Sequence, residues 1–309
     1  MKVLITGGAG FIGRWMVRKF INMGHEVVVL DNLSNGSQDN IKEFLANPRF
    51  KLVKGDIIDS SIVKECFNNI SLCLHLAAQI NVQESLDYPE RAYKNNVLGT
   101  YNVLEAARKN NTKVVLMGTC MVYDLADSSK EIDENHPVKP KSPYAGSKLA
   151  AEYMAESYYY GLGLPITIVR PFNTYGPFQK SNTEGGVVYI FINRNINGET
   201  LNIFGDGTQT RDLLYEEDCA DFIYKAATNP NAVGQIFNAG SGKDVTINEL
   251  AQLICEDKSR IKHVQHHHPQ AEIMKLACNY TKARNVLGWA PKIDLIEGIK
   301  RTEDWIKLQ

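Results

Sequence analysis

A phenol and an ammonium group stand four residues apart at Tyr144 and Lys148. On a helix this spacing places the two side chains on one face. The pKa of a free phenol is about 10, and nearby positive charge lowers it, which makes the phenol a usable acid and base near neutral pH. Helix surfaces often produce this pattern by chance, so its meaning depends on what else the chain carries.

A hydroxyl that can join this pair belongs to Thr119, which follows the apolar run 113–117. If that run is a parallel strand, Thr119 lies at the carboxyl edge of the sheet, where ligands of such folds bind. Its side chain can then orient a substrate alcohol. The alternative is a threonine that only satisfies the backbone at the end of the strand.

A glycine-rich turn provides the context that the tyrosine and lysine need. The run TGGAGFIG at 6–13 follows an apolar strand pattern at 2–6 and opens an amphipathic helix. Gly7 permits the tight turn, Gly10 lets backbone amides approach a pyrophosphate, and Gly13 lets the helix lie close to the strand. This arrangement predicts a dinucleotide site. Lys148 can then hold the nicotinamide ribose, while its charge and that of the nicotinamide lower the pKa of Tyr144.

An acid at the end of the next apolar run indicates which dinucleotide is bound. Asp31 stands 21 residues after Gly10, at the distance expected for a carboxylate that grips a ribose 2′-hydroxyl. The 2′-phosphate of NADP at about 4 Å from this carboxylate would meet a repulsion of about 4 kcal/mol. No Arg or Lys in residues 31–37 relieves that repulsion. The sequence therefore favours NAD.

Alternating patterns along the chain predict the elements that position these residues. Strands are expected at 2–6, 26–30, 50–54, 72–76, 113–117 and 166–170, with helices near 11–23, 41–45, 61–68, 89–110 and 144–161. This is the pattern of an α/β fold with a doubly wound parallel sheet, the Rossmann arrangement. We expect an NAD-binding domain over residues 1–171, with a return of the chain around 213–240. A smaller mixed α/β lobe is expected over residues 172–309.

Composition excludes several classes of partner. The 309 residues hold 34 Lys and Arg against 35 Asp and Glu, a formal net charge of −1, which suits neither nucleic acid nor an anionic membrane. The six cysteines show no C-x-x-C spacing, and no signal peptide or membrane span is found. We expect a cytoplasmic protein with reduced thiols. The three histidines at 266–268 precede a proline in a polar stretch and predict a solvated loop, so no metal site is expected.

Several motifs together resemble the extended short-chain dehydrogenase/reductase family, in particular its nucleotide-sugar epimerases and dehydratases. The resemblance covers nearly the whole chain. It includes DI at 56–57, HLAA at 75–78 and NVLGT at 96–100, which in that family lie beside the cofactor or support it. The most specific matches are RPFNTYGP at 170–177 and GDGTQTRD at 205–212.

The resemblance implies a set of ligand contacts and a homodimer. Cofactor contacts are expected at Gly7, Gly10, Phe11, Ile12, Gly13, Asp31, Asn32, Ser34, Asp56, Ile57, Leu76, Ala77, Ala78, Gln79, Asn96, Tyr144, Lys148 and Pro171. Substrate contacts are expected at Met121, Asn173, Val187, Phe204, Arg211 and Lys275, with Asn173 and Arg211 on the diphosphate of a nucleotide sugar, most simply a UDP-sugar. The dimer would form through the helices at 89–110 and 144–161.

The chemistry implied by the resemblance starts with oxidation of the sugar at C4. Tyr144 takes the proton of the 4-hydroxyl while hydride passes to NAD, and the resulting ketone acidifies the hydrogen at C5. Sugar 4,6-dehydratases carry Asp and Glu after the threonine, whereas this chain has Cys120 and Met121. A thiol can donate a proton to a departing hydroxyl, but a thioether cannot accept one from carbon.

Three functions remain open at this point. The first is elimination of water from a UDP-N-acetylhexosamine, with catalytic residues Thr119, Cys120, Tyr144 and Lys148, and with Tyr144 or the Cys120 thiolate as the base. The Cys-Met pair resembles a branch of UDP-N-acetylglucosamine dehydratases that make 5,6-alkenes. The second is a 4-epimerase, which needs nothing from Cys120 or Met121. The third is a non-catalytic NAD-binding sensor.

Overall fold

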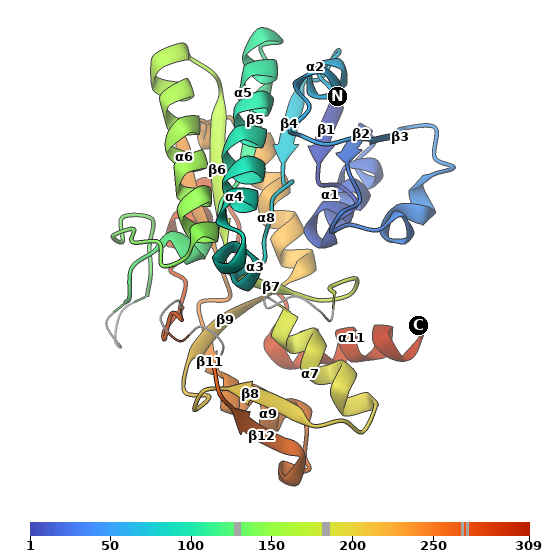
Figure 1. The fold of residues 1–309 in the computed structure, drawn as a ribbon. Helices are drawn as coiled ribbons and strands as arrows, with labels where there is room; N and C mark the ends of the chain where they lie inside the picture. Colours follow the sequence, from blue (N-terminus) through green and yellow to red (C-terminus); the bar gives the residue numbers. More distant parts are fainter. Residues whose placement is uncertain (127–130, 181–185, 267–268, 270–271) are drawn as a thin grey trace.

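The computed structural model describes residues 1–126, 131–180, 186–266, 269 and 272–309. A sheet of seven parallel strands in the order β10-β6-β5-β4-β1-β2-β3 forms its centre (Figure 1). The strands are β1 (Lys2–Thr6), β2 (Glu26–Asp31), β3 (Phe50–Lys54), β4 (Leu72–His75), β5 (Lys113–Met117), β6 (Ile166–Pro171) and β10 (Gln235–Ala239). The predicted doubly wound α/β fold is confirmed.

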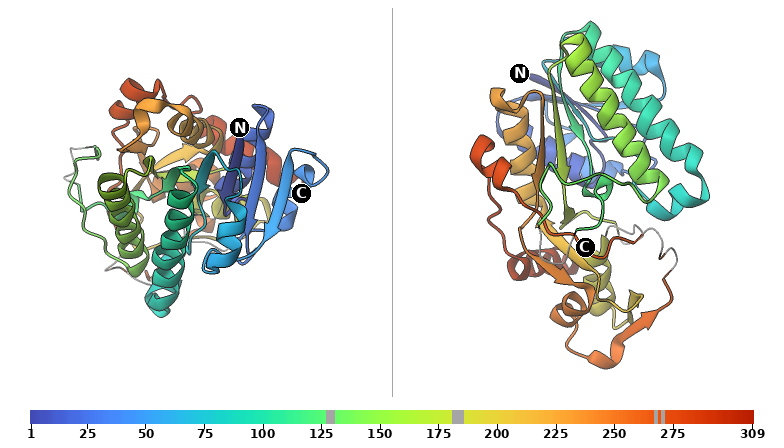
Figure 2. Two further views of the ribbon diagram at one scale, coloured as in Figure 1. Left: turned by 90° about the horizontal axis from the view of Figure 1, so that it is seen from above. Right: turned by 90° about the vertical axis from the view of Figure 1, so that its left-hand side faces the viewer.

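Helices cover both faces of this sheet, which explains why its strands are apolar at nearly every position. Val3 and Ile5 pack into a core with α1 (Phe11–Asn22) and α8 (Glu216–Thr228). Leu4 points to the opposite face, whose core is completed by α2 (Ser60–Cys66), α5 (Thr100–Lys109) and α6 (Pro143–Leu162). A strand buried on both faces cannot alternate between polar and apolar residues. Figure 2 shows the two helical layers on either side of the sheet.

The strand order reverses between β1 and β4, and this reversal locates the ligand site. From β1 the chain continues outward to β2 and β3, whereas β4, β5 and β6 follow one another in the other direction. The loops after β1 and β4 therefore diverge and leave a crevice at the carboxyl ends of the strands. Both the glycine-rich turn and the segment beginning at Leu76 lie at this crevice.

The long helix expected at 89–110 is divided by a wider turn. It consists of α4 (Pro89–Tyr93), a π-helical segment η2 (Lys94–Gly99) and α5. A short helix α3 (Val82–Asp87), which the sequence pattern did not predict, precedes it, and the segment near 41–45 is a 3₁₀ helix η1 (Gln38–Phe44). The helix α6 is regular: the Ser142 hydroxyl accepts from the Ala145 amide at its start, and Gly163 at φ 69° ends it.

A second set of elements packs below the large sheet. It contains a three-stranded sheet of β7 (Asn173–Tyr175), β9 (Thr210–Tyr215) and β11 (Asp244–Thr246), and a pair formed by β8 (Leu201–Phe204) and β12 (Ile261–Val264). The helices α7 (Val187–Ile196), α9 (Ile247–Ile254) and α11 (Leu295–Lys307) share its apolar core, while α10 (Thr281–Leu287) packs with α8 and β10. After β9 the chain returns to the large sheet, where β10 pairs with β6. No helix in the described ranges is long and apolar enough to cross a membrane.

Candidate functional site

The turn between β1 and α1 is packed so closely that its glycines have no room for side chains. Gly7 adopts φ 73°, and a Cβ placed on it would lie 2.7 Å from the Ala77 amide nitrogen. A Cβ on Gly13 would lie 2.1 Å from the carbonyl oxygen of Gly7. Gly10 caps α1, and no side chain accepts a hydrogen bond at this helix start. The turn therefore presents backbone amides to an anion at the positive end of the helix dipole.

Asp31 fixes this turn from the end of β2. One carboxylate oxygen accepts from the Ala9 amide at 2.9 Å, and the other accepts from the Leu33 amide at 2.8 Å. Burial raises the pKa of Asp31, against the two amide hydrogen bonds that lower it. Each oxygen keeps a second lone pair on the side of the cleft, which Asp31 lines. The carboxylate can therefore hold the turn and accept ribose hydroxyls at once.

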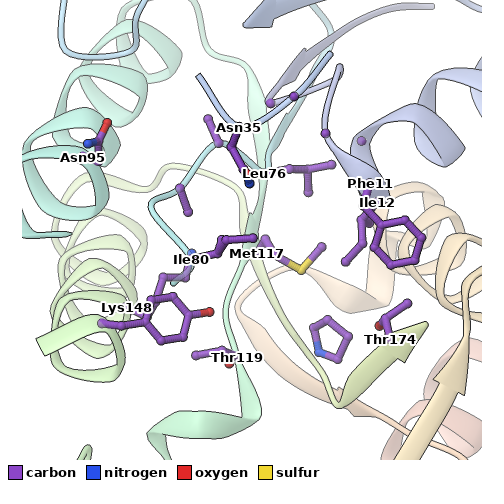
Figure 3. Close-up of a pocket in the computed structure, with 18 of the residues that line it drawn as sticks. Phe11, Ile12, Asn35, Leu76, Ile80, Asn95, Met117, Thr119, Lys148 and Thr174 are labelled. Atoms are coloured by element: carbon purple, nitrogen blue, oxygen red, sulfur yellow. The ribbon is translucent and has the colours of Figure 1, made fainter. Parts of the chain in front are cut away.

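Twenty-one of the predicted site residues line one continuous cleft at the carboxyl ends of the strands (Figure 3). They are Gly7, Gly10, Phe11, Ile12, Gly13, Asp31, Asn32, Ser34, Asp56, Ile57, Leu76, Ala77, Ala78, Thr119, Cys120, Met121, Tyr144, Lys148, Pro171, Asn173 and Arg211. Residues from the amino-terminal turn, from β4 to β6 and from the second set of elements thus meet around one space.

Two predicted cofactor residues, Asn96 and Gln79, lie outside the cleft lining. The Asn96 amide accepts from the Gln79 backbone N–H at 2.8 Å and donates to the Gln79 carbonyl at 3.0 Å and to the Ser147 hydroxyl at 2.9 Å. The wider turn of η2 brings Asn96 under the loop after β4. It therefore ties that loop to α6 from behind.

Three predicted substrate residues also lie outside the lining. Val187 begins α7 without reaching the cleft, and Phe204 is 40% exposed, with its ring against His266. The Lys275 ammonium lies 4.0 Å from Asp244. The predicted solvated loop at 266–268 is described only at His266, because His267 and His268 lie outside the described residues.

The three residues expected to act on a substrate alcohol meet on one wall of the cleft. The Tyr144 phenol is hydrogen-bonded to the Thr119 hydroxyl, and Lys148 lies one helical turn further along α6. Figure 3 shows Thr119 and Lys148 on the same side of the cleft, facing Phe11 and Thr174 across it. The helix brings the phenol and the ammonium to the end of β5, because α6 packs against the segment that follows that strand.

The surroundings of Tyr144 in the protein raise its pKa, whereas the sequence analysis predicted that Lys148 and the nicotinamide lower it. Burial raises the pKa of Tyr144 to about 12, although the hydrogen bond from Thr119 opposes this shift. Burial also lowers the pKa of Lys148 to about 8, and the Glu152 carboxylate opposes that shift. Lys148 by itself therefore does not make Tyr144 acidic. The positive charge of an oxidised nicotinamide bound in the cleft would add to that of Lys148 and favour the phenolate.

The residues after Thr119 provide a thiol and a thioether. Cys120 is 3% exposed and belongs to an apolar cluster with Phe172 and Leu276, and burial raises the pKa of its thiol to about 12. Burial therefore favours the protonated thiol, the form that can donate a proton. Met121 lines the cleft beside it and brings no titratable group.

The expected diphosphate end of the cleft holds a shared carboxylate. Arg211 pairs with Glu272 and also donates to the carbonyl oxygens of Thr210 at 2.7 Å and Ile273 at 2.9 Å. The other oxygen of Glu272 lies 2.6 Å from His266 Nε2. The side-chain oxygen of Asn173 is buried and has no hydrogen-bond partner among the described residues.

Several lining residues were not predicted from the sequence. They are Leu30, Asn35, Gly36, Asn40, Gly55, Ile80, Val82, Asn95, Met117, Gly118, Phe172, Thr174, Phe178, Gln179, Lys180 and Glu272. Most are neighbours of predicted residues, so the motifs could have been extended to include them. Glu272 had no such signal, because it is 61 residues from its partner Arg211.

These observations test whether the cleft fits a dinucleotide. A Cβ on Gly7, Gly10 or Gly13 would lie 2.7, 3.2 or 2.1 Å from the nearest backbone atom, so the three glycines allow the tight turn that a dinucleotide site needs. The carboxylate of Asp31 stands where a ribose diol can bind, and no cation lines the cleft near it within residues 30–40. The residues present therefore fit NAD better than NADP.

Comparisons with known proteins agree with this assignment. The sequence model of the NAD dependent epimerase/dehydratase family matches residues 3–240. The chain belongs to this family. It is an enzyme family that uses NAD, as the sequence analysis expected.

The chain is similar to proteins that carry different names. It is 37% identical to a putative UDP-glucose 4-epimerase of Methanocaldococcus jannaschii, over 99% of this chain and 98% of that protein. Pal from Bacillus thuringiensis superposes with a TM-score of 0.97 at 53% identity, covering 100% and 99%. DesIV of Streptomyces venezuelae, a dTDP-glucose 4,6-dehydratase with NAD bound, gives a TM-score of 0.94 at 29% identity, covering 100% and 98%.

Proposed function

We propose that this enzyme oxidises C4 of a UDP-N-acetylhexosamine and then eliminates water from the 4-keto sugar. The observation that carries the proposal is the meeting of Tyr144, Thr119 and Lys148 with the thiol of Cys120 on one wall of the NAD cleft. Asn173 and Arg211 would hold the diphosphate, because a planar guanidinium pairs with two phosphate oxygens at once. The phosphate would compete with Glu272 for Arg211.

Oxidation at C4 depends on the tyrosine and its two neighbours. Tyr144, as phenolate, removes the proton of the 4-hydroxyl while Thr119 orients that hydroxyl by a hydrogen bond. Lys148 holds the nicotinamide ribose and favours the phenolate by its charge. Bound beside Tyr144 and Lys148, NAD would supply a reversible hydride acceptor for C4.

Elimination follows because a ketone at C4 acidifies the C5–H bond. Tyr144 releases its first proton to solvent and, as a phenolate favoured by the Thr119 hydrogen bond and the Lys148 charge, takes the C5 proton; the C5–C6 double bond forms, and the bond from C6 to its hydroxyl breaks. Cys120 donates its proton to the departing hydroxide, giving water. A thiol whose pKa is raised to about 12 remains protonated at neutral pH. It is still a stronger acid than water, whose pKa is about 15.7.

A 4-epimerase is the second candidate, and Met121 is the observation that favours it. A thioether cannot take the C5 proton, so the carboxylate pair that dehydratases use is absent here. Epimerisation needs only that the keto sugar turns over before hydride returns to its other face. Thr119, Tyr144 and Lys148 suffice for it.

Product analysis with a cysteine variant decides between these functions. With UDP-N-acetylglucosamine, we expect a product lighter by one water, detected by mass spectrometry and NMR. Cys120→Ala is expected to slow its formation by about 100-fold or more, because the departing hydroxide loses its proton donor. Oxidation at C4, measured as nicotinamide absorbance in a single turnover, should persist.

The control is Cys278→Ala, which removes a thiol from the same apolar cluster without changing the cleft lining. It should eliminate water at the normal rate. A product of unchanged mass with inverted C4 would replace the proposal by the epimerase. Bound NAD without turnover of any nucleotide sugar would instead indicate a sensor.

We also propose that two copies of the chain associate through α4, α5 and α6. Tyr93 on α4, Leu98 on the adjoining η2, Tyr101 on α5 and Tyr153 on α6 are between 44% and 55% exposed. Figure 2 shows α5 and α6 side by side at the outer surface. Exposed apolar side chains gathered in this way are typical of a protein interface.

The dimer is tested by placing a charge in this face. Tyr101→Glu is expected to give a monomer in sedimentation analysis, because a buried carboxylate without a partner opposes association. Leu253→Glu on α9, where Leu253 is 48% exposed, is the matched control and should leave the dimer intact. A monomeric unmodified protein would contradict the proposal.

A further inference from the structure

A buried carboxylate stands directly behind the catalytic wall of the cleft. Glu152 follows Lys148 by one turn of α6, so the two side chains share a face of the helix. Glu152 is 1% exposed and Lys148 is 5% exposed. Glu152 does not line the cleft, whereas Lys148 does. A carboxylate this deeply buried is costly unless it is paired and hydrogen-bonded.

A fixed hydrogen-bond network prevents Glu152 from turning away. Its Oε2 accepts from Arg170 Nε at 3.0 Å and from a terminal guanidinium nitrogen at 2.6 Å. Arg170 is held in turn, because it donates to the Tyr123 hydroxyl at 2.8 Å, which donates to Asn238 Oδ1 at 2.7 Å. The network joins β6, β10 and the segment after β5, all at the edge of the sheet that carries the site.

The second oxygen of Glu152 lies beside Gly118, the residue that follows β5. Oε1 is buried and has no hydrogen-bond partner in the described part of the chain. It lies against Gly118, where a Cβ would be only 2.1 Å away, and Gly118 directly precedes Thr119. The carboxylate therefore lies beside the strand end that carries Thr119, on the helix turn next to the one that carries Lys148.

We propose that Glu152 is a positioning residue, whose clamped carboxylate keeps the Lys148 ammonium charged and directed into the cleft beside Tyr144. The inference rests on the proposed function and deepens it. Burial lowers the pKa of Lys148 to about 8, and Glu152 raises it. Without that carboxylate, Lys148 would lose its charge at a lower pH, and the phenolate of Tyr144 would lose a stabilising neighbour.

The other titratable groups around Lys148 do not replace this effect. His75 on β4 is hydrogen-bonded through both ring nitrogens, to Thr6 and Thr100, and burial lowers its pKa to about 3, so it is neutral. The guanidinium of Arg170 is positive and the thiol of Cys120 is protonated. Among the described residues, Glu152 is the carboxylate that acts on Lys148.

The direct test measures the titration of Lys148 itself. In the protein as purified, the rate at which trace acetic anhydride acetylates Lys148 is followed against pH by peptide mass spectrometry. Glu152→Gln keeps the shape of the side chain and removes its charge. Its acetylation midpoint is expected to fall by about one pH unit, because an opposite charge nearby has been removed. The alkaline limb of kcat/KM should move to lower pH by the same amount.

Matched variants separate this effect from a loss of packing. Glu156→Gln, one further turn along α6, should leave the acetylation midpoint of Lys148 unchanged. Glu152→Asp keeps the negative charge, so its midpoint should lie close to that of the unmodified protein. Because Glu152→Gln leaves Arg170 buried without its partner, Glu152→Gln combined with Arg170→Gln tests the same point in a neutral core. An unchanged Lys148 midpoint in both charge-removing variants overturns the inference. A shifted midpoint in a protein that oxidises no nucleotide sugar supports it and overturns the proposed function.

Discussion

Tyr144→Phe is expected to lower the rate of sugar oxidation by about 10³-fold, because in the proposed function the Tyr144 phenolate is the group that takes the proton of the 4-hydroxyl. The variant removes one oxygen and leaves the ring in place. Binding of NAD, measured by fluorescence quenching, should change little, since Gly7, Gly13 and Asp31 are untouched. Single-turnover absorbance of the reduced nicotinamide reports the oxidation step directly.

Tyr153→Phe is the matched control, on the same helix and 55% exposed. It should oxidise the sugar at the rate of the unmodified protein. If Tyr144→Phe kept more than about a tenth of the rate, general base catalysis by this phenol would be excluded, since such catalysis contributes about 10²- to 10⁴-fold.

Gly13→Ala is expected to weaken NAD binding by up to about 100-fold. The added Cβ would lie 2.1 Å from the Gly7 carbonyl oxygen, far inside van der Waals contact. The turn cannot yield easily, because Gly7 donates to the Leu30 carbonyl at 2.9 Å and Gly10 donates to the Gly7 carbonyl at 3.1 Å. Overpacking of this kind costs about 1–3 kcal/mol, and 1.4 kcal/mol corresponds to about tenfold in affinity.

Gly161→Ala is the control, because a Cβ at this helical position meets nothing within 4 Å. Affinity for NAD is measured by isothermal titration, and circular dichroism checks that both variants fold. Normal affinity in a folded Gly13→Ala protein would contradict the prediction and show that the turn accepts a Cβ at this position. Tyr144→Phe and Gly13→Ala thus separate the chemistry of the site from the binding of its cofactor.

Local pattern was a good guide to the parts of the site that lie close together in sequence. The strands at 2–6, 50–54 and 113–117 agree with β1, β3 and β5. A short apolar run between turn signals can be recognised as a strand from its own residues. The same holds for the glycine turn, whose spacing is set by one tight connection between β1 and α1.

The sequence pattern predicted the structure less well where an element is irregular or very short. The run 89–110 has the composition of a single helix, but its backbone widens at η2 and places Asn96 against Gln79. Strand β7 has three residues, too few for a period of two to be recognised. Such details depend on what packs against the segment.

The charge states of the site residues also could not be predicted from their neighbours in the sequence. The high pKa of the Cys120 thiol comes from burial in a cluster that Ile273 and Leu276 complete from a distant part of the chain. Glu272 reaches Arg211 across 61 residues, and Arg170 meets Glu152 across the interface of β6 and α6. No spacing rule connects such partners.

The sequence by itself determined the α/β class, the NAD turn and the tyrosine with its lysine, because each is encoded by residues a few positions apart. Only the tertiary structure decided which of these side chains are buried, which ion pairs they form and in which direction their pKa values are shifted. Those properties follow from desolvation and from charges on other elements, which act through space and leave no periodic trace along the chain.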